Sequence, residues 1–350
     1  MTATFTGIPR ALLAILGPLV ALGLLLSVQG CSTTASAGTS VTGPTPASAL
    51  GVFNSFVTAE KVALANHNEL LALSLLAGSQ YDITAAAYTA ATTAGHPVTG
   101  PVYGRPTLYV PKLTAYPQWF MATVPESAAP GGPARTALLV FDRLDAETTW
   151  ALSGSVLLNP GVPAPKVAAD SAGYATAVPS ADSTLKLRPD VVGATHATVV
   201  DDGPSSAAAP AVQAGPQTTG LYQSNAAIAR QAAAQKTTYS WELEGTSYPS
   251  FALRTTDGGA VVFYTMTLAT SVVPAQPAAQ GKTQGKTKLP VVPVPAALQG
   301  LVPAGHPPFL HGLTVDSTFS YLAVDPAGTA QTAKLQVIGA GGVPTYVHGS

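Results

Sequence analysis

A short aromatic pattern that occurs twice along the chain is the feature that most constrains its fold. Residues 114–123 read TAYPQWFMAT, and residues 246–255 read TSYPSFALRT. In each copy a second apolar run follows, at residues 137–141 and 260–264. Proline is tolerated at the first residue of a strand, so each Tyr-Pro pair predicts a strand start and the next run predicts its antiparallel partner. The duplication predicts two related units; alternatively, two aromatic strands resemble each other by chance.

A helical stretch precedes each copy of the pattern. Apolar residues recur at helical spacing over residues 52–76, and residues 221–236 are rich in alanine. Further strands are predicted at residues 149–158 in the first copy and at 319–324 and 335–338 in the second. A helix covering one face of an antiparallel sheet is the α+β arrangement. We therefore predict an α+β fold of two helix-plus-antiparallel-sheet domains, similar to the cystatin-like and NTF2-like classes.

Domain boundaries are predicted from composition. The first domain is predicted over residues 47–202 and the second over residues 221–350, joined by a linker at 203–220 that is rich in Pro, Ala and Gly. Residues 272–297 of the second domain are a Pro- and Lys-rich insertion, which we predict to be a disordered or polyproline II loop. Its lysines could contact an anionic lipid or wall polymer, or lie in a solvated loop.

The N-terminal residues predict a processing segment that does not belong to the fold. Arg10 carries the only charge in it, and the apolar run at residues 11–26 is shorter than the ~20 residues that span a bilayer. We predict a signal peptide over residues 1–30. The small, uncharged residues 31–46 then predict a flexible tether.

The single cysteine of the chain, Cys31, lies just beyond the apolar run. The segment SVQGCS at residues 27–32 resembles the lipobox of bacterial lipoproteins. The resemblance implies that the Cys31 thiol receives a diacylglyceryl group and that cleavage occurs before it. Acyl chains such as palmitate would then anchor the protein at the extracytoplasmic face of the cell membrane. Alternatively, the segment is an ordinary secretory signal that leaves Cys31 as a free thiol.

Composition excludes several classes of function. The chain has 16 Lys and Arg against 17 Asp and Glu, a net charge of −1, so no basic field is present to hold nucleic acid. One cysteine excludes a disulfide scaffold and multi-cysteine metal sites. The sequence has no Gly-x-Ser-x-Gly motif, no phosphate-binding loop in a strand–turn–helix context and no His-x-x-x-His pair. We predict no catalytic residue, cofactor or metal, and expect a protein that is not an enzyme.

Four residues are candidate ligand contacts. His67 shares a face of the first helical stretch with Glu60, and a histidine or acid facing a cavity could do acid–base work. Tyr116, Trp119 and Tyr248 fall on predicted strands and could line a pocket for an apolar ligand. Alternatively, His67 lies on a solvated face and the aromatic residues fill the core. A closed cavity lined by Tyr and Trp, with His67 or an acid at its wall, would favour ligand carriage or catalysis. A filled core with a flat exposed strand face would favour docking.

Three segments carry a resemblance to known proteins: ANHNE at residues 65–69, the run at 108–120, and ALRTTDGGA at 252–260. Together they resemble a family of actinobacterial envelope lipoproteins whose domain has no known function. The segments occur in order, and the resemblance extends over most of residues 50–340. It implies a class of protein and an envelope location, and no substrate, cofactor or mechanism.

These observations lead to an expected function. We expect a lipid-anchored extracytoplasmic lipoprotein whose role is non-catalytic binding or scaffolding at the cell envelope. Alternatively, the chain is an NTF2-like carrier of a small apolar ligand or an enzyme, or an accessory subunit of a membrane or cell-wall complex. The expected partners are the membrane, through the lipid anchor, and an envelope protein or a small apolar ligand.

Overall fold

The computed structural model describes residues 42–274 and 291–349. The predicted signal peptide, Cys31 and most of the predicted tether lie outside the described residues, as do residues 275–290 of the predicted insertion. Within the described ranges, no helix is both long enough and apolar enough to cross a bilayer.

Three helices begin the described chain: α1 (Pro46–Ala65), α2 (Glu69–Ser74) and α3 (Gly78–Ala94). Helix α1 starts at a capping box, in which Thr45 and Ser48 each accept a hydrogen bond from the other's backbone amide. The predicted first helix is interrupted at His67, whose φ of 49° is left-handed. Asn68 then caps α2 by accepting a hydrogen bond from the Leu71 amide at 3.0 Å. The break follows from the poor helix propensity of the polar residues between α1 and α2.

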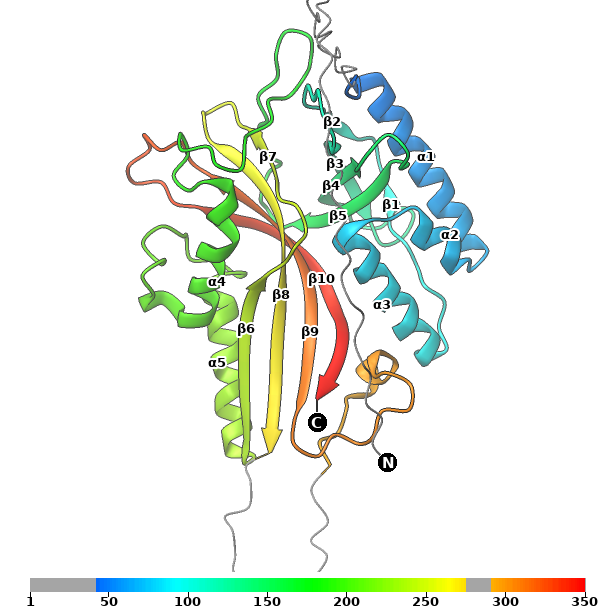
Figure 1. The fold of residues 1–350 in the computed structure, drawn as a ribbon, viewed down its shortest axis with the longest axis vertical. Helices are drawn as coiled ribbons and strands as arrows, with labels where there is room; N and C mark the ends of the chain where they lie inside the picture. The colour runs from blue at the N-terminus through cyan, green and yellow to red at the C-terminus, as the bar shows by residue number, and fades with distance from the viewer. Residues whose placement is uncertain (1–41, 275–290, 350) are drawn as a thin grey trace, which may run out of the picture. The chain divides into compact units, whose positions relative to one another are not determined.

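All the described strands belong to one antiparallel sheet of ten strands (Figure 1). The strands are β1 (Val102–Tyr103), β2 (Thr107–Tyr109), β3 (Gln118–Ser127), β4 (Arg135–Arg143), β5 (Ala151–Leu158), β6 (Thr237–Gly245), β7 (Phe251–Arg254), β8 (Ala260–Pro274), β9 (Leu313–Asp325) and β10 (Gln336–Gly349). Their order is β1-β3-β4-β5-β10-β9-β8-β6, with β2 against β3 and β7 against β8. The helices and this sheet confirm the predicted α+β class.

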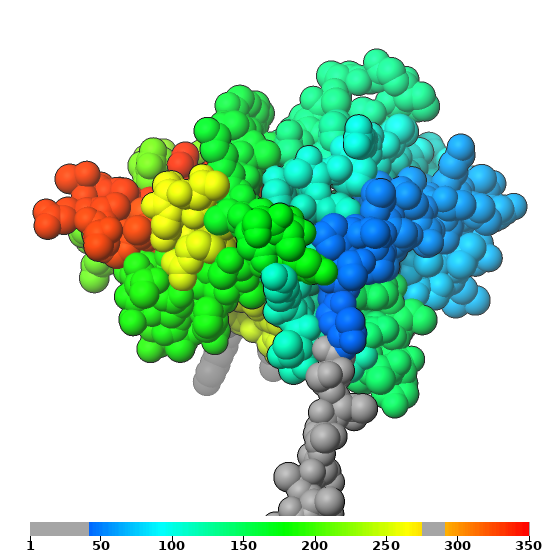
Figure 2. Space-filling model, turned by 90° about the horizontal axis from the view of Figure 1, so that it is seen from above, coloured from blue at the N-terminus to red at the C-terminus, as the bar shows by residue number. Residues whose placement is uncertain are grey.

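The helices cover the sheet in two groups. The other helices are α4 (Val192–Asp202), α5 (Thr219–Ala234) and the short 3-10 helices η1 (Pro189–Val191), η2 (Gly203–Ser205) and η3 (Ala296–Leu301). Helices α4 and α5 pack against β6, whereas α3 packs across β5 and β10 (Figure 1). Figure 2 shows α1, in blue, on the side opposite the orange-red β9–β10 turn. Each half of the sheet thus has its own helices.

The duplicated pattern marks the predicted strand starts. Strand β3 begins at Gln118, directly after the first Tyr-Pro pair, and β7 begins at Phe251, shortly after the second. Trp119 and Phe251 hold the same place in the two copies, and their ring centroids lie 5.1 Å apart. The two strand starts are therefore confirmed, and their aromatic residues meet in one core.

The sheet runs through both of the predicted domains, residues 47–202 and 221–350. Strand β5 of the first pairs with β10 of the second. One buried cluster combines Met121 of the first with Leu253 and Phe263 of the second. The structure therefore shows one compact unit over the described residues, where the sequence predicts two. The reason is physical: the edge strands of the two halves pair with each other, and their apolar faces share a core.

The predicted linker at residues 203–220 does not separate two bodies. It contains η2 and the first residues of α5, and Val212 within it is buried. The Leu335 amide donates to the Ala211 carbonyl at 2.9 Å, which fixes the segment beside the start of β10. The small residues of this segment allow it to pack closely against the sheet. The prediction of a linker at residues 203–220 is therefore wrong, although their composition is typical of linkers.

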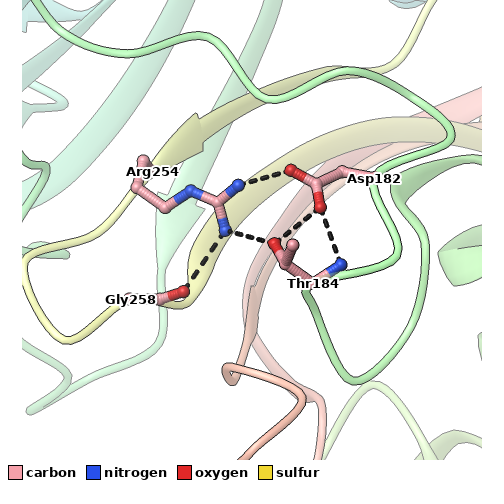
Figure 3. A network of polar contacts seen from close by, with 4 residues as sticks. All are labelled: Asp182, Thr184, Arg254 and Gly258. Atoms are coloured by element: carbon pink, nitrogen blue, oxygen red, sulfur yellow. Dashed lines mark hydrogen bonds and ion pairs between the residues drawn. The ribbon is translucent and has the colours of Figure 1, made fainter.

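A polar network fastens the irregular segment between β5 and α4 to the β7–β8 turn (Figure 3). Arg254 forms an ion pair with Asp182 and donates to the Thr184 hydroxyl at 3.2 Å and to the Gly258 carbonyl at 3.3 Å. Hydrogen bonds from the Thr184 hydroxyl and amide, together with Arg254, lower the pKa of the Asp182 carboxyl. Arg254 belongs to one of the segments that carry the family resemblance, and its contacts hold this turn in place.

Candidate functional site

A cavity of about 250 Å³ lies between helices α1, α2 and α3 and strands β1, β3 and β5. We call it the α1–α3 cavity. Most of its wall is apolar and comes from Phe56, Leu64, Ala72, Leu75, Leu76, Ile83, Ala87, Val98 and Leu152. No lysine, arginine or histidine is among the residues that line it. The cavity is therefore mainly apolar, and electrostatic interactions of the few polar groups in its wall are screened less than in water.

The local sequence explains why this space stays open. Helix α3 turns the small side chains of Thr84 and Ala87 toward it. A Cβ at Gly100 would lie 2.3 Å from Cδ1 of Leu64, so the loop after α3 reaches α1 because residue 100 is glycine. Glu60 and Leu64 are one helical turn apart and place the same stripe of α1 on the cavity.

Two carboxyl groups border the α1–α3 cavity. Glu60 comes from α1 and Glu126 from the end of β3. Burial, followed by the charge of Glu126, raises the pKa of the Glu60 carboxyl to about 7. Burial also raises the pKa of Glu126, against the opposing charge of Arg135. Within the described part of the chain, neither carboxyl has a hydrogen-bond or ion-pair partner.

Two tyrosines share this environment. Tyr88 of α3 is 6% exposed, and its buried hydroxyl has no hydrogen-bond partner among the described residues. Burial, followed by the charges of Glu69 and Glu60, raises its pKa. Tyr103 of β1 pairs with Glu126 in the sheet register, and burial, followed by Glu60, raises its pKa well above the ordinary value. The cavity wall therefore holds two carboxyls and two phenols that can bond to a guest.

The structure places His67 and Tyr116 away from this cavity. His67 is exposed at the corner between α1 and α2 and borders a neighbouring recess together with Glu69 and His96. The Tyr116 hydroxyl accepts a hydrogen bond from Arg143 at 2.6 Å, and the same guanidinium lies 5.1 Å from the Tyr116 ring centroid. His67 and Tyr116 therefore do not line the α1–α3 cavity.

Trp119 and Tyr248 also lie elsewhere. Trp119 is buried in the core shared by the two halves of the sheet. The Tyr248 hydroxyl donates a hydrogen bond to Asp82 of α3, and burial, followed by this bond, raises the pKa of Tyr248 to about 12. The four candidate ligand contacts named from the sequence are therefore not brought together at one site.

Sequence reasoning noticed one residue of the cavity and missed three. Glu60 was considered for the face it shares with His67, but its own signal is the apolar Phe56 and Leu64 one turn to either side, which place an acid on the buried stripe of α1. Glu126, Tyr88 and Tyr103 carry no such local signal, because sheet register and helix packing bring them in. These three residues reach the cavity only when the chain is folded.

A second polar cluster lies in the core beneath α4. His196 is completely buried; its Nε2–H donates to the Gln217 carbonyl at 2.7 Å, which leaves Nδ1 to accept from the Tyr264 hydroxyl at 3.0 Å. The Tyr321 ring centroid lies 4.7 Å from that of His196. Burial lowers the pKa of His196 to about 4. With both ring nitrogens engaged, this neutral histidine supports the core.

The described residues contain no cluster of side chains that could bind a metal ion. No group of three or more His, Cys, Asp or Glu side chains there is arranged to hold a metal ion. The α1–α3 cavity combines a mainly apolar wall with a few polar groups, which is the character of small-molecule sites.

The chain is similar to two uncharacterized lipoproteins of Streptomyces. An uncharacterized lipoprotein of Streptomyces coelicolor is 33% identical over 161 residues, which is 45% of each chain. An uncharacterized lipoprotein of Streptomyces avermitilis is 30% identical over 155 residues, which is 44% of each chain. The matched part thus spans less than half of these curated relatives. No solved structure matches the chain.

A family model covers nearly all of the described fold. The model with the description "Domain of unknown function (DUF8094)" matches residues 42–342. This range includes α1 to α5, all of β1 to β9 and half of β10. It confirms the resemblance to an actinobacterial lipoprotein family with a domain of unknown function. The chain belongs to the family described as Domain of unknown function (DUF8094).

Proposed function

We propose that this protein is a lipid-anchored envelope protein that binds a small, largely apolar molecule in the α1–α3 cavity. The observation that carries the proposal is the Tyr88 hydroxyl, which is buried at the cavity without a hydrogen-bond partner among the described residues. Buried polar groups in folded proteins nearly always have a partner. A bound molecule would supply the partner that Tyr88 and Glu60 lack.

The composition of the wall supports ligand binding over docking. Sites for small molecules are mainly apolar, with a few polar groups that orient the ligand. The cavity has this character: Tyr88 and Tyr103 are its aromatic polar residues, and Glu60 and Glu126 are its acids. These are the features by which the sequence distinguished a ligand carrier from a scaffold, although no tryptophan lines the cavity and His67 lies outside it.

The N-terminal sequence supports the anchor. Cys31 follows an apolar run and the small residue Gly30, and the matched Streptomyces proteins are named lipoproteins. Lipidation of Cys31 with acyl chains such as palmitate would hold the protein at the extracytoplasmic face of the membrane. The cavity would then be placed to meet apolar molecules of the envelope.

Replacing Cys31 by serine is expected to release the protein from the membrane, because the hydroxyl cannot take the thioether-linked lipid. Wild type and Cys31→Ser are expressed in an actinobacterial host, the membrane and soluble fractions are compared by immunoblot, and the mature mass is measured. Wild type should sediment with membranes and carry lipid mass, while the variant should not. A variant that stays in the membrane fraction, beside a wild type with no lipid mass, would disprove the anchor.

Filling the cavity tests ligand binding directly. Ala87 faces the cavity from α3, so Ala87→Phe should occupy its volume and weaken binding of the neutral apolar dye N-phenyl-1-naphthylamine by at least about tenfold. Ala94→Phe, at an exposed position of the same helix, is the matched control and should bind as wild type does. Dye fluorescence gives the affinity, and thermal unfolding checks that both variants fold.

Native mass spectrometry of the mature protein purified from its host adds an independent measurement. A noncovalent adduct of small mass on wild type, absent from Ala87→Phe, is expected. If dye and adduct are equally retained by Ala87→Phe and wild type, the ligand lies elsewhere and the proposal for this cavity is wrong.

A further inference from the structure

We infer that the molecule bound in the α1–α3 cavity carries a positive charge, and that Glu60 and Glu126 are its counter-ions. The chemical class is an organic cation: an ammonium group on a compact apolar body. This inference rests on the proposed function and adds the nature of the ligand's polar group.

The charges around the cavity are the first argument. Glu60 and Glu126 approach it from a helix and from a strand, and no cationic side chain lines it. Arg135 lies opposite Glu126 in the β3–β4 register, but its guanidinium donates to the Leu158 carbonyl at 2.7 Å, and no ion pair joins it to Glu126. Among the described residues, neither acid therefore forms an ion pair, although the charge of Arg135 still acts on Glu126 from a greater distance.

Tyr88 is the second, independent argument. Its side chain is more than nine-tenths buried and borders the cavity, and its hydroxyl is unpartnered. A tyrosine hydroxyl both donates and accepts, so it can donate to a carboxylate while accepting from an ammonium N–H. Besides burial, the charges of Glu69 and then Glu60 raise the pKa of Tyr88, and of these two acids Glu60 lines the cavity. A guest ammonium would satisfy the hydroxyl and the carboxyl together.

The energetics favour a cation over a neutral guest. Glu60 and Glu126 are half-buried beside a mainly apolar space, and the charge of Glu126 makes ionisation of Glu60 less favourable. An ammonium group between the two carboxyls would favour their ionised forms. The aromatic rings of Phe56 and Tyr103, which line the wall, also attract cations. A metal ion would require more ligands than the described acids provide. An organic cation with an apolar body fits both the charge and the lining.

A pair of probes of nearly equal shape separates charge from apolar fit. 1-Naphthylmethylamine is cationic and 1-naphthylmethanol is neutral. Both are titrated calorimetrically into the full mature chain at about pH 8, where Glu60, with its pKa of about 7, is largely ionised. Wild type is expected to bind the amine at least about tenfold more tightly than the alcohol.

Variants assign the preference to the two acids. The double variant Glu60→Gln, Glu126→Gln should lose the preference for the amine and keep its affinity for the alcohol, because the amides preserve shape without charge. Glu147→Gln, an exposed acid outside the cavity, is the control and should retain the full preference. Thermal unfolding should show the double variant at least as stable as wild type, since buried like charges are removed.

The outcomes separate this inference from the proposed function. Equal affinity of wild type for the two probes, or a preference that survives in the double variant, would overturn the cation assignment while leaving ligand binding in the cavity intact. Binding of neither probe would overturn both. A preference that only the double variant loses is the expected result.

Discussion

Replacing Gly154 by valine is expected to lower the free energy of unfolding by about 3 kcal/mol or more. Gly154 lies in β5, and a Cβ there would sit 2.1 Å from Cζ of Phe263 and 2.9 Å from two further ring atoms. Phe263 is buried in the core that joins the two halves of the chain. Since the ring has no free space to move into, even one added carbon must push β5 and β8 apart.

Urea unfolding of the mature chain, followed by circular dichroism, measures this effect. Gly51→Ala is the control: Gly51 lies within α1, and nothing lies within 4 Å of its added Cβ. Alanine there should leave stability unchanged or raise it by up to about 1 kcal/mol. A Gly154→Val midpoint equal to that of wild type would show that the two halves of the sheet do not pack as described.

The second large effect is a loss of stability in acid that originates at His196. Its folded-state pKa is about 4, below the ordinary value of 6.5, because the ring is buried. Between these values the unfolded chain binds a proton that the folded chain does not. Stability from this residue is therefore lost as the pH falls from about 6.5 to about 4, by roughly 3 kcal/mol in total.

The variant His196→Gln isolates this contribution, because glutamine does not titrate. At about pH 8 the variant should be less stable by roughly 2 kcal/mol, since the bonds to Tyr264 and Gln217 are disturbed. As the pH falls to about 4, the difference in unfolding free energy between the two proteins should close or reverse, because only wild type loses the contribution of His196. The carboxyl groups titrate alike in both proteins, so their effects cancel. The exposed His96→Gln is the control. Stability curves that stay parallel across this pH range would contradict the assignment.

Carboxyl groups elsewhere act in the opposite direction. Burial raises the pKa of Asp142 to about 6 and that of Glu60 to about 7. A carboxyl whose folded-state pKa is raised opposes folding when it ionises, so its unfavourable effect grows as the pH rises through that pKa. The difference between wild type and His196→Gln is therefore a cleaner measurement than the pH profile of wild type alone.

Much of the secondary structure was predictable because its signals are local. Each Tyr-Pro pair precedes a strand, and the apolar run that follows each copy forms its antiparallel partner. The break at His67 was harder to predict, since the apolar spacing continues past it. Asn66 caps the end of α1 and donates to the Val62 carbonyl, and Asn68 caps the start of α2, so local side-chain bonds outweigh the periodicity.

The number of domains was not predictable in the same way. A segment rich in Pro, Ala and Gly, residues 203–220, is typical of a linker, yet here it packs beside β10. Nothing in the local sequence says that the edge strand of one half will pair with that of the other. Whether the two halves pair depends on how well their side chains pack together. The close approach of Gly154 to the Phe263 ring shows how tight this packing is.

The sequence by itself determined the class of the elements, the start of the key strands, the lipobox-like segment at Cys31 and the family resemblance. Turn chemistry, side-chain periodicity and motifs act over a few residues and can be recognised there. Only the tertiary structure decided that the two halves share one sheet, and that Glu60, Glu126, Tyr88 and Tyr103 surround one cavity. These residues lie far apart in the chain, and the free energy that brings them together comes from strand pairing and burial, which no single segment contains.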